Sequence, residues 1–325
     1  MNTIAVAGIL CDVFGLDDLP SDCDEITCLW ALHGRTLDRS WLHPSILETL
    51  HKHRERRTSE RKGQQGGLIA VCFDQRNHGS RLVSPAANTD WLGGNKTAAT
   101  DLFATYQGTA TDVRVLIDFL PCYLPPEIGA KIRHHMVAGD SLGGHAAWQV
   151  VLQEPRVSAA VVFIGFPDFI RLMSWRAEAA RLPSSSDGGQ RFLGSEDFPP
   201  ALVEAVSRYD PAASLLGKAV PLFTLQHTPG GVEEWSSDPD LMSASHLTAA
   251  LAREMRHRLR NKSILNLYAT RDPTVPPHAS APFLSWLSHA TRPGAWFDGE
   301  GCRVENIGVD GVHALTAEMI ALETQ

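Results

Sequence analysis

Short runs of apolar and β-branched residues alternate with helical patterns along the chain, and this alternation is its most constraining feature. Runs without polar alternation are typical of strands buried on both faces, as in parallel sheets. The helical patterns between them supply the crossover connections that parallel strands need. We therefore expect an α/β fold: a mostly parallel twisted sheet with helices on both faces. The predicted strands are Glu25–Leu32, Gly67–Phe73, His134–Gly139, Ala159–Phe166 and Ser263–Ala269.

Helical spacing of apolar residues predicts one helix from Leu102 to Leu120, ending at Pro121, and another over residues 246–260. Residues 168–218 break the rhythm with a polar, Gly/Pro-rich segment followed by a short helical run. We expect a cap or lid insertion at about 168–218 within a single domain that covers residues 1–325. The run Pro221–His227 could be a strand of the sheet or of the insertion, and the sequence does not place it.

Composition excludes several classes of partner. The net charge of -8 is spread along 325 residues, whereas nucleic acids and anionic membranes need clustered positive charge. The one basic run, His51–Gly67, is interrupted by glutamates and is typical of a solvated helix end. The apolar N-terminal stretch lacks a basic start and a small-residue cleavage site. No stretch approaches the roughly 18 apolar residues of a membrane span, so we expect a cytoplasmic chain.

The six cysteines form no CxxC pair and no zinc spacing, which predicts reduced structural thiols and no metal site. No sequence feature indicates a cofactor or an oligomeric state.

The segment MVAGDSLGGH contains the pattern Gly139-x-Ser141-x-Gly143, between a predicted strand and a predicted helix from Leu142. A strand that turns into a helix within so few residues makes a crowded bend, and flanking glycines permit it. The bend exposes the serine hydroxyl and directs the helix N-terminus toward it. There the backbone N–H of Leu142 and the helix dipole can stabilise an oxyanion. We therefore expect Ser141 to be a nucleophile.

Together with two further motifs, this segment makes most of the chain resemble the α/β-hydrolase superfamily. LWALHGRTLDRSW, residues 29–41, is similar to the family's oxyanion loop, in which the residue after HG offers its backbone N–H. The resemblance thus implies Arg35 as the second oxyanion donor. FDQRNHGSR, residues 73–81, is similar to the family's DxRGHGxS turn but has Asn77 where glycine is common. That motif shapes a turn, so we expect His78 to be structural.

A serine hydroxyl needs an imidazole to accept its proton and an acid to orient the imidazole. His313 follows a plausible last strand and a Gly-rich turn, and its surroundings resemble the family's GHxxT. His145 and His278 are weaker candidates for the base. Asp272, in ATRDPTVPP, resembles the acid of the family's GxxDxxVP loop, and the order serine, acid, histidine is that of the fold.

A rival interpretation uses the string Gly139-Asp140-Ser141-Leu142, which resembles the motif of the GDSL esterases, whose DxxH pair would be Asp310 and His313. In that family the serine motif ends the first strand, and a GxND block supplies an oxyanion asparagine. Here Ser141 follows at least three predicted strands, and no GxND occurs. We therefore expect Asp272 to be the acid and Asp310 to be a turn residue.

These motifs predict a cofactor-free serine hydrolase that cleaves a small-molecule carboxylic ester or thioester through an acyl-enzyme. Trp175 and Phe192 of the insertion could line the acyl pocket. Two alternatives remain open. One is an acyltransferase or lyase that uses the same three residues, and the other is a non-catalytic binding protein of hydrolase fold. Products formed with and without an acceptor alcohol would separate the enzymatic options.

Overall fold

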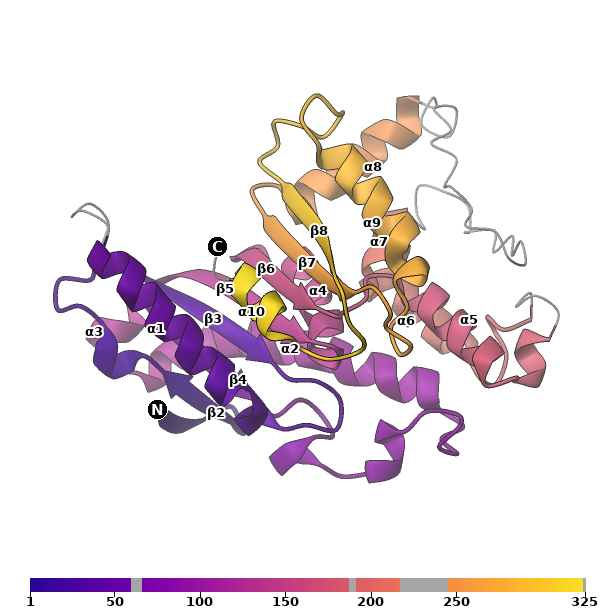
Figure 1. Ribbon diagram of the computed structural model, residues 1–325, viewed down its shortest axis with the longest axis horizontal. Helices are drawn as coiled ribbons and strands as arrows, with labels where there is room; N and C mark the ends of the chain where they lie inside the picture. The colour runs from indigo at the N-terminus through magenta and orange to yellow at the C-terminus, as the bar shows by residue number, and fades with distance from the viewer. Residues whose placement is uncertain (60–65, 187–190, 217–244, 324–325) are drawn as a thin grey trace.

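The structure is a computed structural model that describes residues 1–59, 66–186, 191–216 and 245–323. The strands it describes form one sheet in the order β1-β2-β4-β3-β5-β6-β7-β8 (Figure 1). Strand β2 pairs antiparallel with β1 and β4, and the other neighbouring strands are parallel. The predicted α/β fold with a mostly parallel sheet is confirmed. The strands are β1 (Asn2–Val6), β2 (Ile9–Phe14), β3 (Ile26–Leu32), β4 (Gly67–Phe73), β5 (Ile132–Asp140), β6 (Val157–Phe163), β7 (Ser263–Ala269) and β8 (Arg303–Val309).

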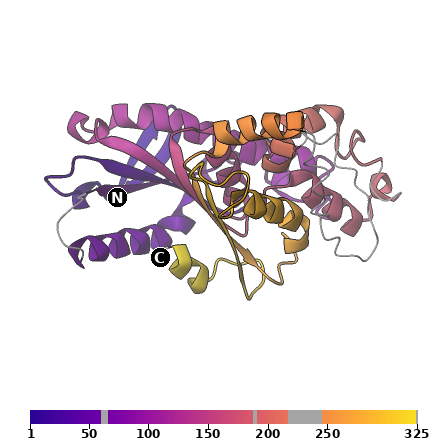
Figure 2. The same ribbon diagram turned by 90° about the horizontal axis from the view of Figure 1, so that it is seen from above.

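Helices cover both faces of the sheet (Figure 2). On one face, α1 (His43–Ser59) and α10 (Ala317–Glu323) pack over an apolar cluster that includes Ile46 and Met319. On the other, a larger apolar cluster joins the sheet to α2 (Ala98–Tyr123), α4 (Leu142–Gln153), α8 (Ser245–Leu259) and α9 (Pro277–Thr291). The remaining helices are α3 (Pro126–Gly129), α5 (Phe169–Ala179), α6 (Pro200–Tyr209) and α7 (Pro211–Leu216).

Two predicted elements need correction. The helix expected to end at Pro121 continues as α2 to Tyr123, with Pro121 in its last turn. Proline lacks only its own N–H, so a helix that is already ending loses one hydrogen bond there rather than its whole last turn. The strand predicted over Ala159–Phe166 is β6, which begins at Val157 and ends at Phe163.

The N-terminal hairpin of β1 and β2 was not predicted from the sequence. Val6 pairs with Ile9 across a two-residue turn in which Ala7 and Gly8 have φ of 49° and 80°. Positive φ at both turn residues matches the twist of the strands, and alanine is an unusual residue for it. The hairpin adds two antiparallel strands at one edge of the sheet.

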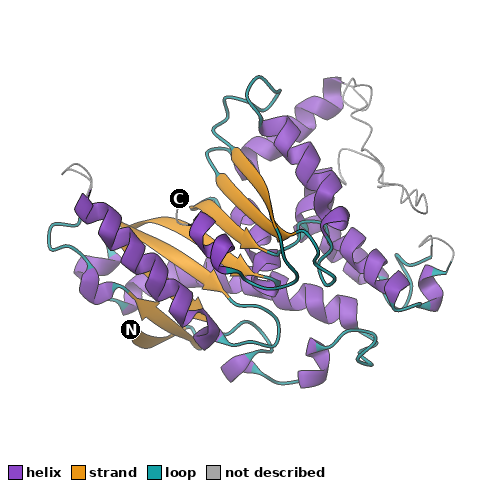
Figure 3. Ribbon diagram, in the orientation of Figure 1, coloured by secondary structure: helices purple, strands orange, loops and turns teal. Residues whose placement is uncertain are grey.

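The predicted insertion, residues 168–218, lies between β6 and β7. Its described residues include helices α5, α6 and α7 (Figure 3). Helix α5 packs against α9, α6 against α2, and α7 against α4 and α8. Its role as a lid stays a prediction. Residues 187–190, residues 217–218 and the strand candidate Pro221–His227 lie outside the described residues.

The structure also describes the start of the basic run and all six cysteines. The basic run begins within α1, where Lys52 pairs with Glu48 and His51 pairs with Glu55 one helical turn away. All six cysteines are free thiols, and all except Cys122 are buried. In the described ranges, the helices are either too short or too polar to cross a membrane.

Candidate active site

The turn from β5 into α4 holds Ser141 in a strained conformation. Ser141 has φ 51° and ψ -108°, a region that costs a non-glycine residue about 1–3 kcal/mol. A Cβ at Gly139 would clash with the carbonyl oxygen of Gly143, and a Cβ at Gly143 would clash with the carbonyl oxygen of Leu32. The crowding that the GxSxG pattern indicates is therefore present, and only glycine fits on either side of the serine.

Three predicted site residues come together at the carboxyl ends of parallel strands. Ser141 follows β5, Asp272 follows β7, and His313 lies in the loop after β8. The Ser141 Oγ lies 2.8 Å from His313 Nε2, and His313 Nδ1 lies 2.6 Å from Asp272 Oδ2. The second Asp272 oxygen accepts hydrogen bonds from the backbone N–H groups of Thr274 and Val275, each at 2.8 Å. These bonds hold a buried carboxylate in one orientation.

The rival acid, Asp310, lies at the surface. Its side chain is 79% exposed and forms a salt bridge with Arg271 at 3.0 Å. The serine also follows the fifth strand along the chain, not the first as in the GDSL esterases. Both observations favour the α/β-hydrolase interpretation of the motif.

The other candidate histidines have packing roles. His145 is buried in α4, with ring contacts to Tyr106 and Phe166. His278 stands at the start of α9 against Trp175. His78 is 2% exposed, and its Nδ1 donates to the Arg76 carbonyl oxygen at 2.9 Å, which agrees with a structural role in its turn.

The HG loop after β3 is tied to the serine turn. The His33 carbonyl oxygen accepts the N–H of Gly143 at 3.1 Å, and the His33 ring accepts the N–H of Gln75 at 3.0 Å. Burial lowers the pKa of His33 to about 4, so the ring is neutral at physiological pH. A Cβ at Gly34 would lie 3.7 Å from the Ser141 Cβ. The loop therefore runs directly beside the serine.

The two predicted oxyanion donors, Leu142 and Arg35, lie in different segments: the start of α4 and the HG loop. Leu142 is the first residue of α4, and Arg35 follows Gly34 in the HG loop. Within the described ranges, neither backbone N–H donates a hydrogen bond to the protein. Free N–H groups at a helix N-terminus and in an adjacent loop are what an oxyanion hole requires. Their role stays a prediction.

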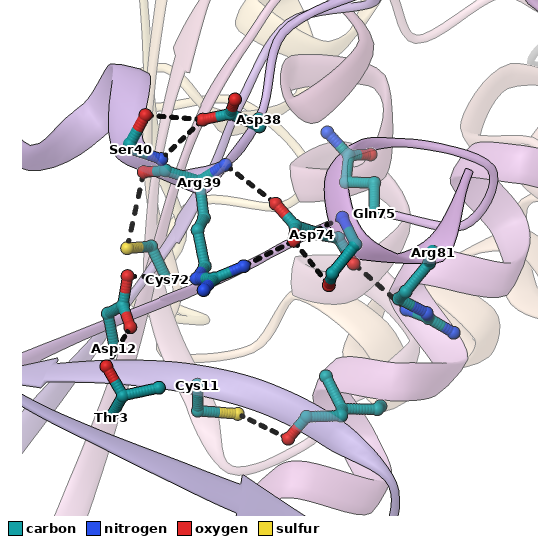
Figure 4. Close-up of polar contacts among 12 residues, drawn as sticks. Thr3, Cys11, Asp12, Asp38, Arg39, Ser40, Cys72, Asp74, Gln75 and Arg81 are labelled. Atoms are coloured by element: carbon teal, nitrogen blue, oxygen red, sulfur yellow. Dashed lines mark hydrogen bonds and ion pairs between the residues drawn. The ribbon is translucent and has the colours of Figure 1, made fainter.

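A salt-bridge network that the sequence did not reveal holds the HG loop to the sheet (Figure 4). Arg39 donates from Nε to Asp12 Oδ2 on β2 at 2.9 Å and from Nη1 to Asp74 Oδ2 after β4 at 2.5 Å. Its backbone N–H donates to the same Asp74 carboxylate at 2.9 Å. The Ser80 hydroxyl also donates to Asp74, at 2.6 Å. We call Arg39, Asp12 and Asp74 the Arg39 network.

Donor atoms of Asp12, His43 and Cys72 beside this network lie within 4.8 Å of one another, as metal ligands do. The chemistry does not fit a cation. Arg39 already neutralises Asp12, and His43 Nε2 lies 3.0 Å from the same carboxylate. Burial raises the pKa of the Cys72 thiol, and a metal would need the thiolate. Asp12 belongs to the Arg39 network, and His43 and Cys72 lie beside it.

Sequence reasoning also missed two charged residues: Asp140, which precedes Ser141 in the chain, and Arg176, beside the loop that carries Asp272. Asp140 is 7% exposed, its Oδ1 has no hydrogen-bond partner among the described residues, and burial raises its pKa to about 6. Arg176, on α5, donates from Nη2 to the Thr274 carbonyl oxygen at 2.9 Å, in the loop that carries Asp272. Asp140 lies within the serine motif, so the sequence contained a signal for it. The sequence contained no such signal for Arg176, because its place depends on how α5 packs.

One predicted pocket residue is wrong. Phe192 is fully buried, in ring contact with Trp91 and Phe198, so it is a core residue of the insertion and does not face a pocket. Trp175 is half-buried, beside His278.

Comparisons with known proteins support the fold. No family model matches the sequence, and no curated protein matches it. Among solved structures, TT1662 from Thermus thermophilus aligns over 100% of this chain and 96% of its own, with 17% identity and a TM-score of 0.52.

Two esterase structures give weaker matches. The Pyrococcus furiosus esterase Pf2001 aligns over 99% of this chain and 90% of its own, with 14% identity and a TM-score of 0.49. Est1E from Butyrivibrio proteoclasticus, in a structure with bound ferulic acid, aligns over 100% and 95%, with 14% identity and a TM-score of 0.45. At such identities the likeness concerns the fold and not the activity. From its strand order and its serine turn, together with the likeness to TT1662, the chain has the α/β-hydrolase fold.

Proposed function

We propose that this protein is a serine hydrolase that cleaves a carboxylic ester or thioester through an acyl-enzyme. The observation that carries the proposal is the continuous hydrogen-bonded chain from Asp272 through His313 to Ser141. Such a chain lets a weak hydroxyl nucleophile lose its proton as it attacks a carbonyl carbon.

Asp272 is the positioning acid in this scheme. Two backbone N–H groups hold its Oδ1, so its Oδ2 accepts the Nδ1–H of His313 from a fixed direction. With the proton on Nδ1, the Nε2 of His313 is an acceptor for the Ser141 hydroxyl. The carboxylate also stabilises the imidazolium that forms when the serine proton moves.

The reaction then has two halves. The Ser141 oxygen attacks the substrate carbonyl while His313 takes its proton, and the backbone N–H groups of Leu142 and Arg35 stabilise the oxyanion. His313 returns the proton to the departing alcohol or thiol, which leaves Ser141 acylated. Water attacks the acyl-enzyme, again with His313 as the base, and releases the acid and the free serine. Apart from this water molecule, every reacting group in these steps belongs to the chain or to the ester.

Matched substitutions of two aspartates test this assignment. With a substrate selected from a panel of 4-nitrophenyl esters and acyl thioesters, Asp272→Asn should lower kcat by roughly 10⁴-fold. Ser141→Ala should lower it by as much as about 10⁶-fold. Asp310→Asn removes one carboxylate from the neighbouring loop and should change kcat less than about threefold, because its side chain is solvent-exposed.

Circular dichroism and thermal unfolding of each variant control for loss of the fold. If Asp310→Asn abolishes activity and Asp272→Asn does not, the acid is Asp310 and the proposed scheme is wrong. If Ser141→Ala retains the activity of the wild type, the nucleophile is elsewhere.

A further inference from the structure

Two arginine side chains flank the Ser141 site from different elements. Arg35 follows Gly34, whose Cβ position is 3.7 Å from the Ser141 Cβ. Arg176 comes from α5, and its guanidinium donates to the Thr274 carbonyl oxygen beside Asp272. The two guanidinium groups are close enough that the charge of Arg35 lowers the pKa of Arg176. The HG loop thus carries one arginine directly after Gly34, and the insertion places another beside the loop that carries Asp272.

These two arginines differ from Arg39 and Arg156 in what they contact. Arg39 and Arg156 form salt bridges with two carboxylates each. Across the described ranges, Arg35 has no hydrogen bond or salt bridge from its side chain, and Arg176 has only a neutral carbonyl acceptor. Both residues are half-buried.

Carboxylates act on these two guanidinium groups only from a distance. Asp90 lies within electrostatic range of both guanidinium groups and raises the pKa of each, but it forms a salt bridge with neither in the described structure. Asp272 also raises the pKa of Arg176, but the oxygens of its carboxylate accept hydrogen bonds from His313 and two backbone N–H groups. Within the described structure, neither guanidinium therefore has a carboxylate in direct contact.

Without a bound anion, the charged form of Arg176 is disfavoured. Burial is the largest cause that lowers the pKa of Arg176, to about 10, and the charge of Arg35 acts in the same direction. An anion placed between the guanidinium groups would relieve both effects, and the planar fork of arginine suits a carboxylate in particular.

We propose that Arg35 and Arg176 bind a carboxylate on the substrate, so that the preferred ester or thioester carries a free carboxylate as well as its scissile acyl group. This substrate class rests on the proposed hydrolase function. The side chain of Arg35 would act here separately from its backbone N–H, which faces the oxyanion in that scheme.

Paired substrates that differ by one carboxylate test the proposal. On the acyl side the pair is mono(4-nitrophenyl) glutarate and 4-nitrophenyl valerate, and on the alcohol side it is 4-(butyryloxy)benzoate and phenyl butyrate. The readout is the ratio of kcat/KM for the anionic ester to kcat/KM for its neutral partner. Comparing this ratio between variants cancels the intrinsic reactivity of each ester.

In at least one pair, Arg176→Gln and Arg35→Gln should each lower the ratio by about tenfold or more, the usual effect of losing a hydrogen bond to a charged group. Arg176→Lys keeps the charge and should retain a higher ratio than Arg176→Gln. Arg208→Gln, on the exposed face of α6 and paired with Glu204, is the matched control and should leave the ratio unchanged.

The two proposals fail in different ways. If hydrolysis depends on Ser141 but the ratio is the same in wild type and both glutamine variants, the carboxylate site is wrong and the hydrolase function stands. If none of the four esters is cleaved in a Ser141-dependent way, the hydrolase function fails. Calorimetry with glutarate and valerate then decides the site: glutarate binding that Arg176→Gln weakens about tenfold supports it, and absent or unchanged binding overturns it.

Discussion

Replacing Asp140 by asparagine should stabilise the protein in a pH-dependent way. Asp140 lines an apolar crevice between α1 and the C-terminal segment, together with Leu42, Ile46 and Leu315. Its Oδ1 is buried and has no hydrogen-bond donor in the described structure. Burial is the dominant cause that raises its pKa from 3.8 to about 6, and the nearby His313 opposes the rise. The charged form of this carboxyl is therefore costly in the folded state.

The magnitude and sign follow from the pKa difference. A rise of about two pKa units corresponds to about 3 kcal/mol, at 1.36 kcal/mol per unit. Because the folded state binds this proton more tightly than the unfolded state, the favourable contribution is fully present below pH 3.8. It is lost as the pH rises to about 6. The asparagine side chain does not titrate, so Asp140→Asn should gain about 2–3 kcal/mol over wild type between pH 4 and pH 8.

Urea unfolding followed by tryptophan fluorescence at several pH values between pH 4 and pH 8 measures this difference. Asp310→Asn, which removes a solvent-exposed carboxyl, controls for the loss of one negative charge from the chain. A difference between wild type and Asp140→Asn that is constant with pH would refute the argument. So would a variant that loses stability relative to wild type as the pH rises.

Three further perturbations probe the surroundings of the site. Arg39→Gln leaves the buried carboxylates of Asp12 and Asp74 without their cation and should lower the free energy of unfolding by about 3 kcal/mol in urea titrations; an unchanged value would show that the network contributes nothing. Gly143→Ala has no room for its methyl group against the Leu32 carbonyl and should cost about 3 kcal/mol in the same assay, with a variant as stable as wild type contradicting the packing. Zinc or a chelator should leave the Tm unchanged, because Arg39 already pairs with Asp12 of the Asp12, His43 and Cys72 cluster. A saturable, zinc-dependent rise in Tm would reveal a metal site there.

The central strands could be predicted well because their environment leaves a simple pattern in the sequence. Gly67–Phe73 and Ser263–Ala269 were predicted with the bounds that the structure has, since strands covered on both faces are continuous apolar runs. The edge hairpin was missed for the opposite reason. Its first strand is largely exposed, and its turn uses Ala7 in place of the Asn or Asp that would signal such a turn.

Some residues of the candidate site could be predicted from the sequence, and others could not. The turn around Ser141 can be recognised in the sequence because the residues that it crowds are close neighbours in the chain. Those residues, Gly139 and Gly143, must be glycines. Arg176 carries no such mark, because its position depends on how α5 packs beside the loop of Asp272. Phe192 shows the converse error: an aromatic residue in an insertion gives no sign of whether it faces a pocket or, as here, the core.

The most direct test of the account is whether Ser141 is an activated nucleophile in the native protein. A fluorophosphonate probe phosphonylates only serines whose hydroxyl has a general base, and mass spectrometry of the labelled chain locates the adduct. The account predicts one adduct per chain, on the peptide that contains Ser141, and its loss in His313→Ala. A native wild-type protein that stays unlabelled, or an adduct on another serine that persists in Ser141→Ala, would contradict it.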